Sequence, residues 1–284
     1  MTLSRGATLL ALVAAGACAR PAPPVAAPAP RDSLPRDTVV VAPRPDTIRP
    51  AAPAEPIRLR PARITLAFTG DINLGTTTLP GGLPPDSGRR LLASAAPHLV
   101  GDLVVGNLEG VFADTGVSEK CIDRPALARL RRAGRTPKEP PVRANCYAFR
   151  TPTFLAARLR EAGFSHLNLA NNHSGDLGAA GRASTRAVLD SLGLRSYGPL
   201  DRISIDTVVR GDSLAVVALI GFTTYPFAYN LLDIERSAAV VDSVRPLVDI
   251  LVVTFHGGGE GAAAVRTGTG PEFLGSEPRG DLRR

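Results

Sequence analysis

The sequence predicts an α/β protein in which a parallel or mixed sheet is covered by helices. Five apolar runs rich in β-branched residues are nearly continuous rather than alternating, which indicates strands buried on both faces. Segments with helical periodicity, ending at glycines, lie between some of these runs. Strands and helices that alternate along one chain favour an α/β layer architecture.

The predicted strands and helices can be assigned in chain order. The five strand runs are "ITLAFTGD" (64–71), "DLVVGNLEG" (102–110), "FSHLNLANNH" (164–173), "LAVVALIGFT" (214–223) and "VDILVVTFHGGGE" (248–260). A helix is predicted over 151–163, with a threonine cap at its start and Gly163 as its stop. A second helix is predicted over 179–193, because its apolar residues and Thr185 fall on one face.

The first 18 residues have the features of an export signal. Arg5 supplies the positive start, Ala7 to Ala15 form an apolar run too short to span a bilayer, and small residues follow. Cys18 follows "AAGA", which resembles a bacterial lipoprotein cleavage box. Two interpretations stay open: a lipidated Cys18 that tethers the chain to a membrane, or an ordinary cleaved signal with a chance cysteine. Both predict an exported protein, periplasmic or extracellular.

Residues 19–62 predict an extended spacer ahead of one domain over residues 63–284. Proline and alanine dominate the spacer, and such a composition cannot build a core. Within the domain, residues 113–150 interrupt the order of strands and helices. The part over 119–150 holds nine basic and three acidic side chains, a net charge of +6.

This basic insertion has two interpretations, an attractor for polyanions or a solvated surface loop. On the first, Arg131, Arg132 and Arg135 are candidate substrate-binding residues for an anionic polymer. No aromatic residues are interleaved with these charges, so nucleic acid is not predicted as a partner. In an exported protein, Cys121 and Cys146 predict a disulfide that closes the insertion; two free thiols are the alternative. Closing a loop of this length contributes about 3 kcal/mol when the geometry is unstrained.

Polar residues follow the apolar runs at the carboxyl ends of the predicted strands, where loops converge to form ligand sites. These residues are Asp71, Glu109, Asn172, His173, His256 and Glu260. Carboxylate, amide oxygen and imidazole are ligand types that hold divalent ions of borderline hardness. Glu109 could bridge two ions, with Asp71 and His256 completing separate shells. His173 would then serve as a general acid.

Local interpretations compete with this one. Asn171 and Asn172 could cap the turn after a strand, because asparagine tolerates left-handed backbone. The "HGGGEG" stretch could be a flexible loop or a phosphate-binding turn. His98 and His166 have no partner motif, so we expect them to be packed or surface histidines rather than ligands.

The motifs "TGDINLG", "VVGNLEG", "LANNHSGD" and "VTFHGGGE", in this order and spacing, resemble those of the CapA family of bacterial capsule and poly-γ-glutamate synthesis proteins. The resemblance implies a four-layer, metallophosphoesterase-like sandwich of two mixed sheets flanked by helices. By position it implies Asp71, Glu109, Asn172 and His256 as ligands of two divalent ions (Mn, Fe or Zn) and His173 as the catalytic histidine. Asn171 and Glu260 beside them are candidate substrate contacts.

The resemblance implies one of two functions. The first is a phosphoesterase-type hydrolase acting on an anionic polymer or phosphoester of the cell envelope. The second is a non-catalytic envelope protein that binds or guides such a polymer. Family members continue with a Gly-His-x-Pro-His loop that supplies further ligands, and this chain has no second histidine cluster. We therefore expect the domain to be incomplete at its C-terminus and the hydrolase activity to belong to the full-length protein; the sequence predicts no oligomeric state.

Overall fold

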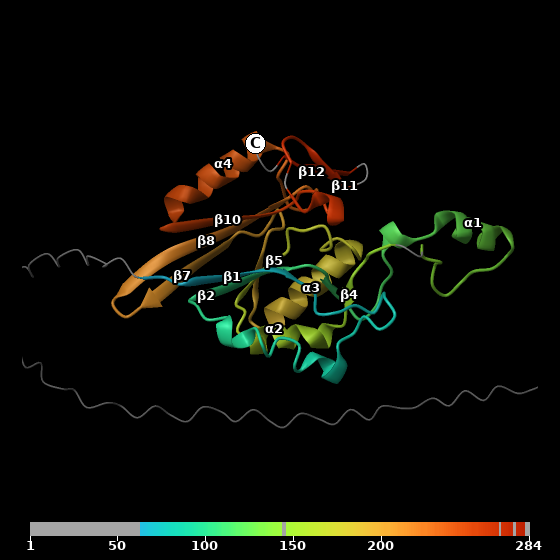
Figure 1. The fold of residues 1–284 in the computed structure, drawn as a ribbon, viewed down its shortest axis with the longest axis horizontal. Helices are drawn as coiled ribbons and strands as arrows, with labels where there is room; N and C mark the ends of the chain where they lie inside the picture. The colour runs from blue at the N-terminus through green and yellow to red at the C-terminus, as the bar shows by residue number, and fades with distance from the viewer. Residues whose placement is uncertain (1–62, 144–145, 267, 275–276, 282–284) are drawn as a thin grey trace, which may run out of the picture. The chain divides into compact units, whose positions relative to one another are not determined.

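The computed structural model describes residues 63–143, 146–266, 268–274 and 277–281 (Figure 1). The predicted signal (1–18), Cys18 and the spacer (19–62) lie outside the described residues. Among the described helices, none is long and apolar enough to cross a membrane.

The first sheet has the strand order β1-β2-β5-β6, and its described pairings are all parallel. Its strands are β1 (Leu66–Ile72), β2 (Leu103–Leu108), β5 (His166–Asn168) and β6 (Arg195–Tyr197). Parallel pairing requires crossover connections, and the longest helix of the domain supplies the one from β5 to β6.

The second sheet is mixed and has the order β10-β8-β7, with β9 also paired to β8. Its strands are β7 (Ser204–Arg210), β8 (Ser213–Thr223), β9 (Tyr229–Asn230) and β10 (Ile250–His256). β7 and β8 form an antiparallel hairpin, whereas β10 and β9 run parallel to β8. The predicted α/β class with helices and a mixed sheet is therefore confirmed, but only the second sheet mixes strand directions.

Helices and short segments complete the described chain. The α-helices are α1 (Arg124–Arg132), α2 (Ala157–Ala162), α3 (Gly178–Ser191) and α4 (Ile234–Val244). The short strands are β3 (Val111–Phe112) paired with β4 (Arg150–Thr151), and β11 (Glu272–Leu274) paired with β12 (Glu277–Gly280). The 3-10 turns are η1 (Pro85–Gly88), η2 (Ala96–His98), η3 (Glu119–Cys121), η4 (Thr153–Ala156), η5 (Arg245–Leu247) and η6 (Ala262–Ala264).

The predicted helix over 151–163 begins differently from the prediction. A 3-10 turn, η4, precedes α2, and no threonine side chain caps it. Asp114 takes that role from a distant loop: one carboxylate oxygen accepts from the Thr153 N–H (2.9 Å) and the other from its hydroxyl (2.7 Å). Gly163 ends α2 with a left-handed backbone, as predicted.

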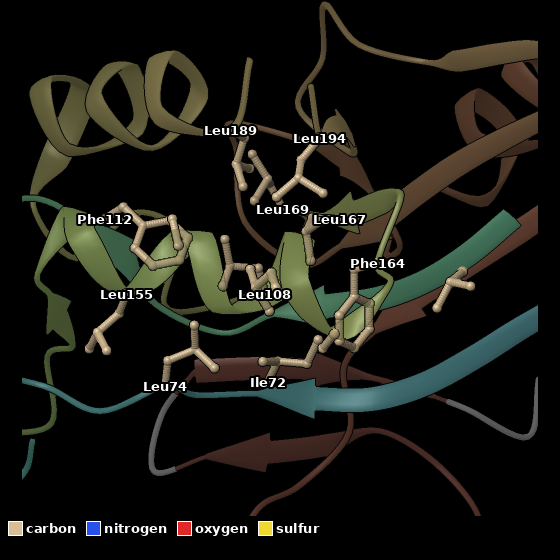
Figure 2. Close-up of a cluster of buried hydrophobic side chains, with 14 residues drawn as sticks. Ile72, Leu74, Leu108, Phe112, Leu155, Phe164, Leu167, Leu169, Leu189 and Leu194 are labelled. Carbon is tan, nitrogen blue, oxygen red and sulfur yellow. The ribbon is translucent and has the colours of Figure 1, made fainter. Parts of the chain in front are cut away.

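The continuous apolar runs are explained by packing on both faces. In β2, Val104 joins the core between the first sheet and helices α2 and α3 (Figure 2), whereas Leu103 and Val105 face the second sheet. In β8, Leu219 packs with Leu103 and Val105 in the core between the two sheets, and Ile220 packs on the opposite face against α4. Successive strand residues point to opposite faces, so a strand between two cores must be apolar throughout.

The basic insertion carries helix α1, which extends to one side in Figure 1. Cys121 and Cys146 are joined in a disulfide with their Cα atoms 5.4 Å apart. An antiparallel bridge between Ile122 and Val142 lies at the same level of the insertion. The insertion therefore has a closed base and an exposed helical arm.

A candidate metal centre at the strand ends

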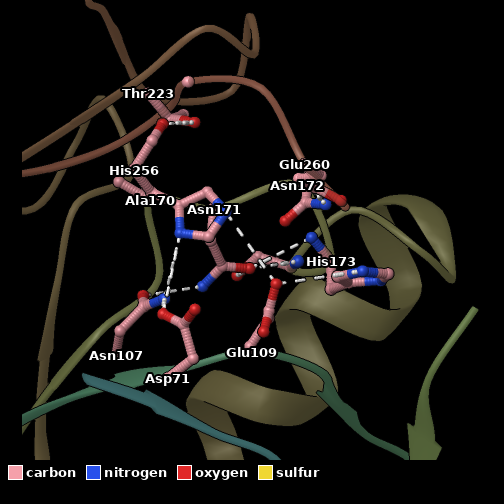
Figure 3. Close-up of polar contacts among 12 residues, drawn as sticks. Asp71, Asn107, Glu109, Ala170, Asn171, Asn172, His173, Thr223, His256 and Glu260 are labelled. Atoms are coloured by element: carbon pink, nitrogen blue, oxygen red, sulfur yellow. Dashed lines mark hydrogen bonds and ion pairs between the residues drawn. The ribbon is translucent and has the colours of Figure 1, made fainter. Parts of the chain in front are cut away.

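Asp71, Glu109 and His256 come together at the carboxyl ends of three strands. Asp71 is the second-last residue of β1, Glu109 directly follows β2, and His256 ends β10. One ligand atom from each residue lies within 4.8 Å of the others, and Figure 3 shows the three side chains converging from both sheets. This group unites residues from 71 to 256 because parallel strands bring their carboxyl ends to one edge.

The distances within the group leave space between the donor atoms. His256 Nδ1 lies 3.8 Å from an Asp71 carboxylate oxygen, and His256 Nε2 lies 3.8 Å from a Glu109 oxygen. Both distances are too long for hydrogen bonds. The Glu109 and His256 side chains are mostly buried, whereas Asp71 is 55% exposed. The group is thus open on the side of Asp71.

Two of the predicted metal ligands have a buried atom without a hydrogen-bond partner among the described residues: Asn172 Oδ1 and His256 Nε2. A buried polar atom without a partner costs free energy, so native proteins rarely keep one without a reason. An amide oxygen and an imidazole nitrogen are both metal ligands. These two atoms, with the carboxylates of Asp71 and Glu109, fit a divalent cation.

The electrostatics of the group also favour a cation. Burial, followed by repulsion from Asp71, raises the pKa of Glu109 above its ordinary value. Burial lowers the pKa of His256, so its ring tends to be neutral and to keep a lone pair for a ligand. A positive ion between these groups would relieve the repulsion between the two carboxylates.

Asn107 in β2 connects the members of the group, and no role was predicted for it. Its amide nitrogen lies 2.7 Å from Asp71 Oδ1 and 3.3 Å from His256 Nδ1. Its amide oxygen accepts from Asn168 and Asn171, each at 3.0 Å. The amide orientation follows from this network. A polar residue inside the otherwise apolar run "VVGNL" was the available signal.

Asn171 is a buried turn residue, and this geometry gives no support to its predicted contact with substrate. It is fully buried, and its amide nitrogen donates to the Leu108 carbonyl (2.8 Å). Its amide oxygen accepts from the backbone N–H groups of His173 (3.1 Å) and Ser174 (2.9 Å). The local turn-capping interpretation therefore holds for Asn171.

Glu260 orients Asn172. The Asn172 amide nitrogen donates to Glu260 (3.2 Å), which fixes the amide oxygen as the free end of the group. Glu260 in turn accepts from Arg279 (2.6 Å), a guanidinium only 1% exposed that also donates to the Gly258 carbonyl. Glu260 is thus engaged within the protein, and its predicted role as a substrate contact has no support in this geometry. Arg279 lies in β12, in a segment where the sequence shows no motif.

The glycine-rich stretch after β10 is hydrogen-bonded to the C-terminal strand pair β11 and β12. The Gly258 N–H donates to the Arg279 carbonyl (2.6 Å), and the Gly259 N–H donates to Glu272 (2.6 Å). These two N–H groups are therefore engaged and not free for a phosphate.

His173 lies beside the three-residue group, with its Nε2 3.9 Å from a Glu109 oxygen. Its Nδ1 lies 2.7 Å from Asp176 Oδ2, and its ring stacks on Phe149 with centroids 4.1 Å apart. Asp176 is part of the motif "LANNHSGD", yet its role was not predicted. The imidazole is held on one side and faces the metal group on the other.

The remaining predicted residues lie elsewhere. His166 is buried and hydrogen-bonded, and His98 is on the surface; neither belongs to the three-residue group, as expected. Arg131, Arg132 and Arg135 are exposed on α1 and the turn after it. Their side chains form no hydrogen bond or ion pair with any described residue, including those of the metal group.

Comparison with known proteins agrees with the motifs. A family model described as "Bacterial capsule synthesis protein PGA_cap" matches residues 65–269, more than half of the chain. The matched stretch contains all four motifs and confirms the resemblance that they predict. A search of curated proteins found no match.

Proposed function

The chain belongs to the bacterial capsule synthesis protein family, and we propose that within it the protein is a metal-dependent phosphoesterase-type hydrolase. Family membership relates it to capsule or poly-γ-glutamate synthesis. The observation that carries the proposed activity is the group of Asp71, Glu109 and His256 beside two unpartnered buried donor atoms. Helices α2 and α3 pack on the first sheet, the two sheets pack on each other, and α4 packs on the second sheet. This order of layers supports our assignment of a four-layer, metallophosphoesterase-like sandwich.

Four residues would hold the metal: Asp71, Glu109, Asn172 and His256. We propose two divalent ions (Mn, Fe or Zn), with Glu109 as the shared ligand. When bound, such ions supply Lewis-acid activation of a phosphoester and of the attacking water. Asn107 holds Asp71 and His256 in place, and Glu260 keeps the Asn172 oxygen aimed at the site.

His173 is the proposed proton donor to the leaving oxygen. Its Nε2 faces Glu109, while Asp176 accepts at Nδ1 and restrains the ring. A general acid held in hydrogen-bond reach of a leaving group contributes about 100- to 10,000-fold in rate. The stacking of Phe149 covers one face of the imidazole.

The proposed substrate is an anionic polymer or phosphoester of the cell envelope. The guanidinium groups of Arg131, Arg132 and Arg135 are exposed, have no partners among the described residues and are free to attract such a polymer. We also propose export, with residues 1–18 as the signal, Cys18 as a lipid attachment site, 19–62 as the spacer and 63–284 as the domain. This location would bring the insertion to the polymer.

Metal content and turnover of the full chain test the proposal. We expect the chain to retain Mn, Fe or Zn after dialysis and to cleave bis-(p-nitrophenyl) phosphate, with turnover lost on chelation and restored by the metal. His256→Ala should lose both properties, and the exposed His98→Ala should lose neither. A chain that binds metal but does not cleave phosphoesters would overturn the proposed activity.

A second candidate is a non-catalytic protein that holds or guides an anionic polymer. It is favoured by the position of the free arginines on α1, where they make no contact with the metal group. A metal-free chain that binds polyglutamate and loses binding on charge reversal of α1 would support this candidate over the hydrolase.

A further inference from the structure

Asp176 is a fully buried carboxylate on which three separate segments converge. Its Oδ2 accepts from the Phe149 N–H (2.7 Å) and lies 2.7 Å from His173 Nδ1. Its Oδ1 is ion-paired with the ammonium group of Lys120, and the Asp176 side chain is 0% exposed. A buried carboxylate needs such partners, since an unpaired charge in the interior is strongly destabilising.

Two of these partners mark the ends of the basic insertion. Lys120 directly precedes Cys121, and Phe149 follows Cys146 by three residues. Phe149 contacts His173 a second time, because its ring stacks on the imidazole with centroids 4.1 Å apart and planes at 29°. The start and the end of the insertion therefore both reach the same histidine, one through Asp176 and one directly.

The base of the insertion holds these two ends together. The disulfide joins Cys121 to Cys146. The Arg143 N–H donates to the Cys121 carbonyl (2.8 Å), and the Asp123 N–H donates to the Pro141 carbonyl (2.8 Å). Lys120 and Phe149 lie just outside this closed base. Separating the two chain segments that the base joins would therefore move the groups that contact Asp176 and His173.

We propose that the disulfide-closed base of the insertion is a clasp that positions His173, with Lys120, Asp176 and Phe149 as the positioning residues. This inference rests on the proposed function in one respect, the role of His173 as proton donor. The clasp would couple the helical arm, which we propose attracts the polymer, to His173 and the metal group, which we propose act on the polymer.

The clasp fixes which ring nitrogen carries a proton. An ionised carboxylate accepts hydrogen bonds and cannot donate, so the Asp176 contact requires the proton of His173 to be on Nδ1. The proton that a doubly protonated His173 can give up is therefore the one on Nε2, which faces Glu109. The hydrogen bond at one imidazole nitrogen thus sets the state and direction of the other.

Imidazole ¹⁵N NMR of the full chain tests the clasp without relying on activity. The chain has four histidines, so the His173 resonances can be assigned by comparison with His173→Gln. The proton-donor form carries a proton on both ring nitrogens; under conditions where the ring is neutral, we expect the Nδ1–H form alone in the parent chain and a mixture of tautomers in Lys120→Met. Lys120→Arg should retain the parent spectrum because it keeps the cation.

The chain offers a matched control, since Lys138 is the one other lysine and lies in the same insertion. Lys138→Met should leave the His173 resonances unchanged. Reduction of the disulfide in the parent chain should give the Lys120→Met pattern, and reoxidation should reverse it; this arm needs no variant to fold. If both Lys120→Met and the reduced chain keep the parent His173 spectrum, the clasp is refuted.

Kinetics separate this inference from the proposed function. With an alkyl phosphodiester such as glycerophosphocholine, whose alkoxide leaving group must take up a proton, Lys120→Met should lower kcat about 10-fold, part of what a general acid contributes, and leave KM unchanged. If His173→Gln turns over at the parent rate while the NMR arms behave as expected, the clasp stands and the proton-donor role fails.

Discussion

Two of the described clusters in which histidine meets carboxylate, those of His166 and His256, differ in how far their polar atoms are satisfied. His166 has a partner at each ring nitrogen: the Ser165 hydroxyl at 2.8 Å and Asp206 at 3.0 Å. Asp206 also binds Ser204 and Arg195. At His256, Nε2 is buried without a hydrogen-bond partner among the described residues, and the nearest carboxylates are 3.8 Å away.

This difference distinguishes a structural cluster from a candidate site. A closed network stabilises the fold because every buried group is paired. An open group stores unfavourable contacts that a ligand can relieve, and such groups are typical of functional sites. Residue type alone does not separate the two clusters, since both combine imidazole with carboxylate. The following predictions test whether the clusters respond as differently as their geometry implies.

The largest expected effect is a loss of metal binding when the open cluster around His256 is broken. His256→Ala removes a proposed ligand, so we expect metal affinity to fall at least about 100-fold. The unfolding free energy of the metal-free chain should change less than it does in the closed cluster, because Nε2 has no partner to lose and Nδ1 has only the 3.3 Å contact with Asn107. Isothermal titration with Mn²⁺ and Zn²⁺ measures the affinity. Equal affinity in His256→Ala and the parent would remove His256 from the ligand set.

Breaking the closed cluster should reverse this pattern. His166→Ala leaves Asp206, a largely buried carboxylate, without one of its partners, and should lower the unfolding free energy by about 2–3 kcal/mol. Metal affinity should stay at the parent value. Urea unfolding measures the stability, with the exposed His98→Ala as the control, expected within about 0.5 kcal/mol of the parent. A loss of metal affinity in His166→Ala would show that the clusters are coupled.

The sequence could predict the open cluster because its members follow apolar runs at the same relative place. That rule identified Asp71, Glu109 and His256, which the structure unites. It missed Asn107, which lies inside a strand. A polar residue among apolar ones signals that it has partners, but it does not show where in the sequence those partners are. It also missed Arg279, which reaches Glu260 from the C-terminal hairpin, a contact that depends on tertiary structure.

The local alternatives were decided by packing. The sequence allows Asn171 to be interpreted either as a turn residue or as a site residue. Its complete burial and its hydrogen bond from the His173 N–H favour the turn. The fold class followed from the apolar runs because both faces of β2 and β8 are covered. The cap of the helix after β4 could not be predicted, since Asp114 comes from a distant loop.

The closed cluster should also show a pH dependence of defined sign. Burial tends to raise the pKa of Asp206, but hydrogen bonds from His166 and Ser204 outweigh burial and hold the pKa below its ordinary value of 3.8. The stabilisation is therefore present above about pH 4 and is lost as the pH falls below it. Asp206→Asn should reduce this acid-side loss, measured as urea midpoints at pH 6 and pH 3.5. The control is Asp201→Asn at an exposed ion pair, and the same pH slope in both variants would contradict the assignment.

The smallest expected effect concerns the arm, which takes no part in either cluster. Arg131→Glu, Arg132→Glu and Arg135→Glu together should weaken binding of polyglutamate about 5-fold at low ionic strength, because exposed charges act over distances that salt screens. The difference should shrink toward zero near 0.5 M salt, where the screening length is a few ångströms. Metal affinity and stability should not change, since these side chains have no partners within the described protein. The control reverses Arg89 and Arg90, exposed basic residues outside the insertion. Equal polymer affinity of the arm variant and the parent across the salt series would show that the arm does not bind the polymer and would leave the metal group as the candidate site of contact.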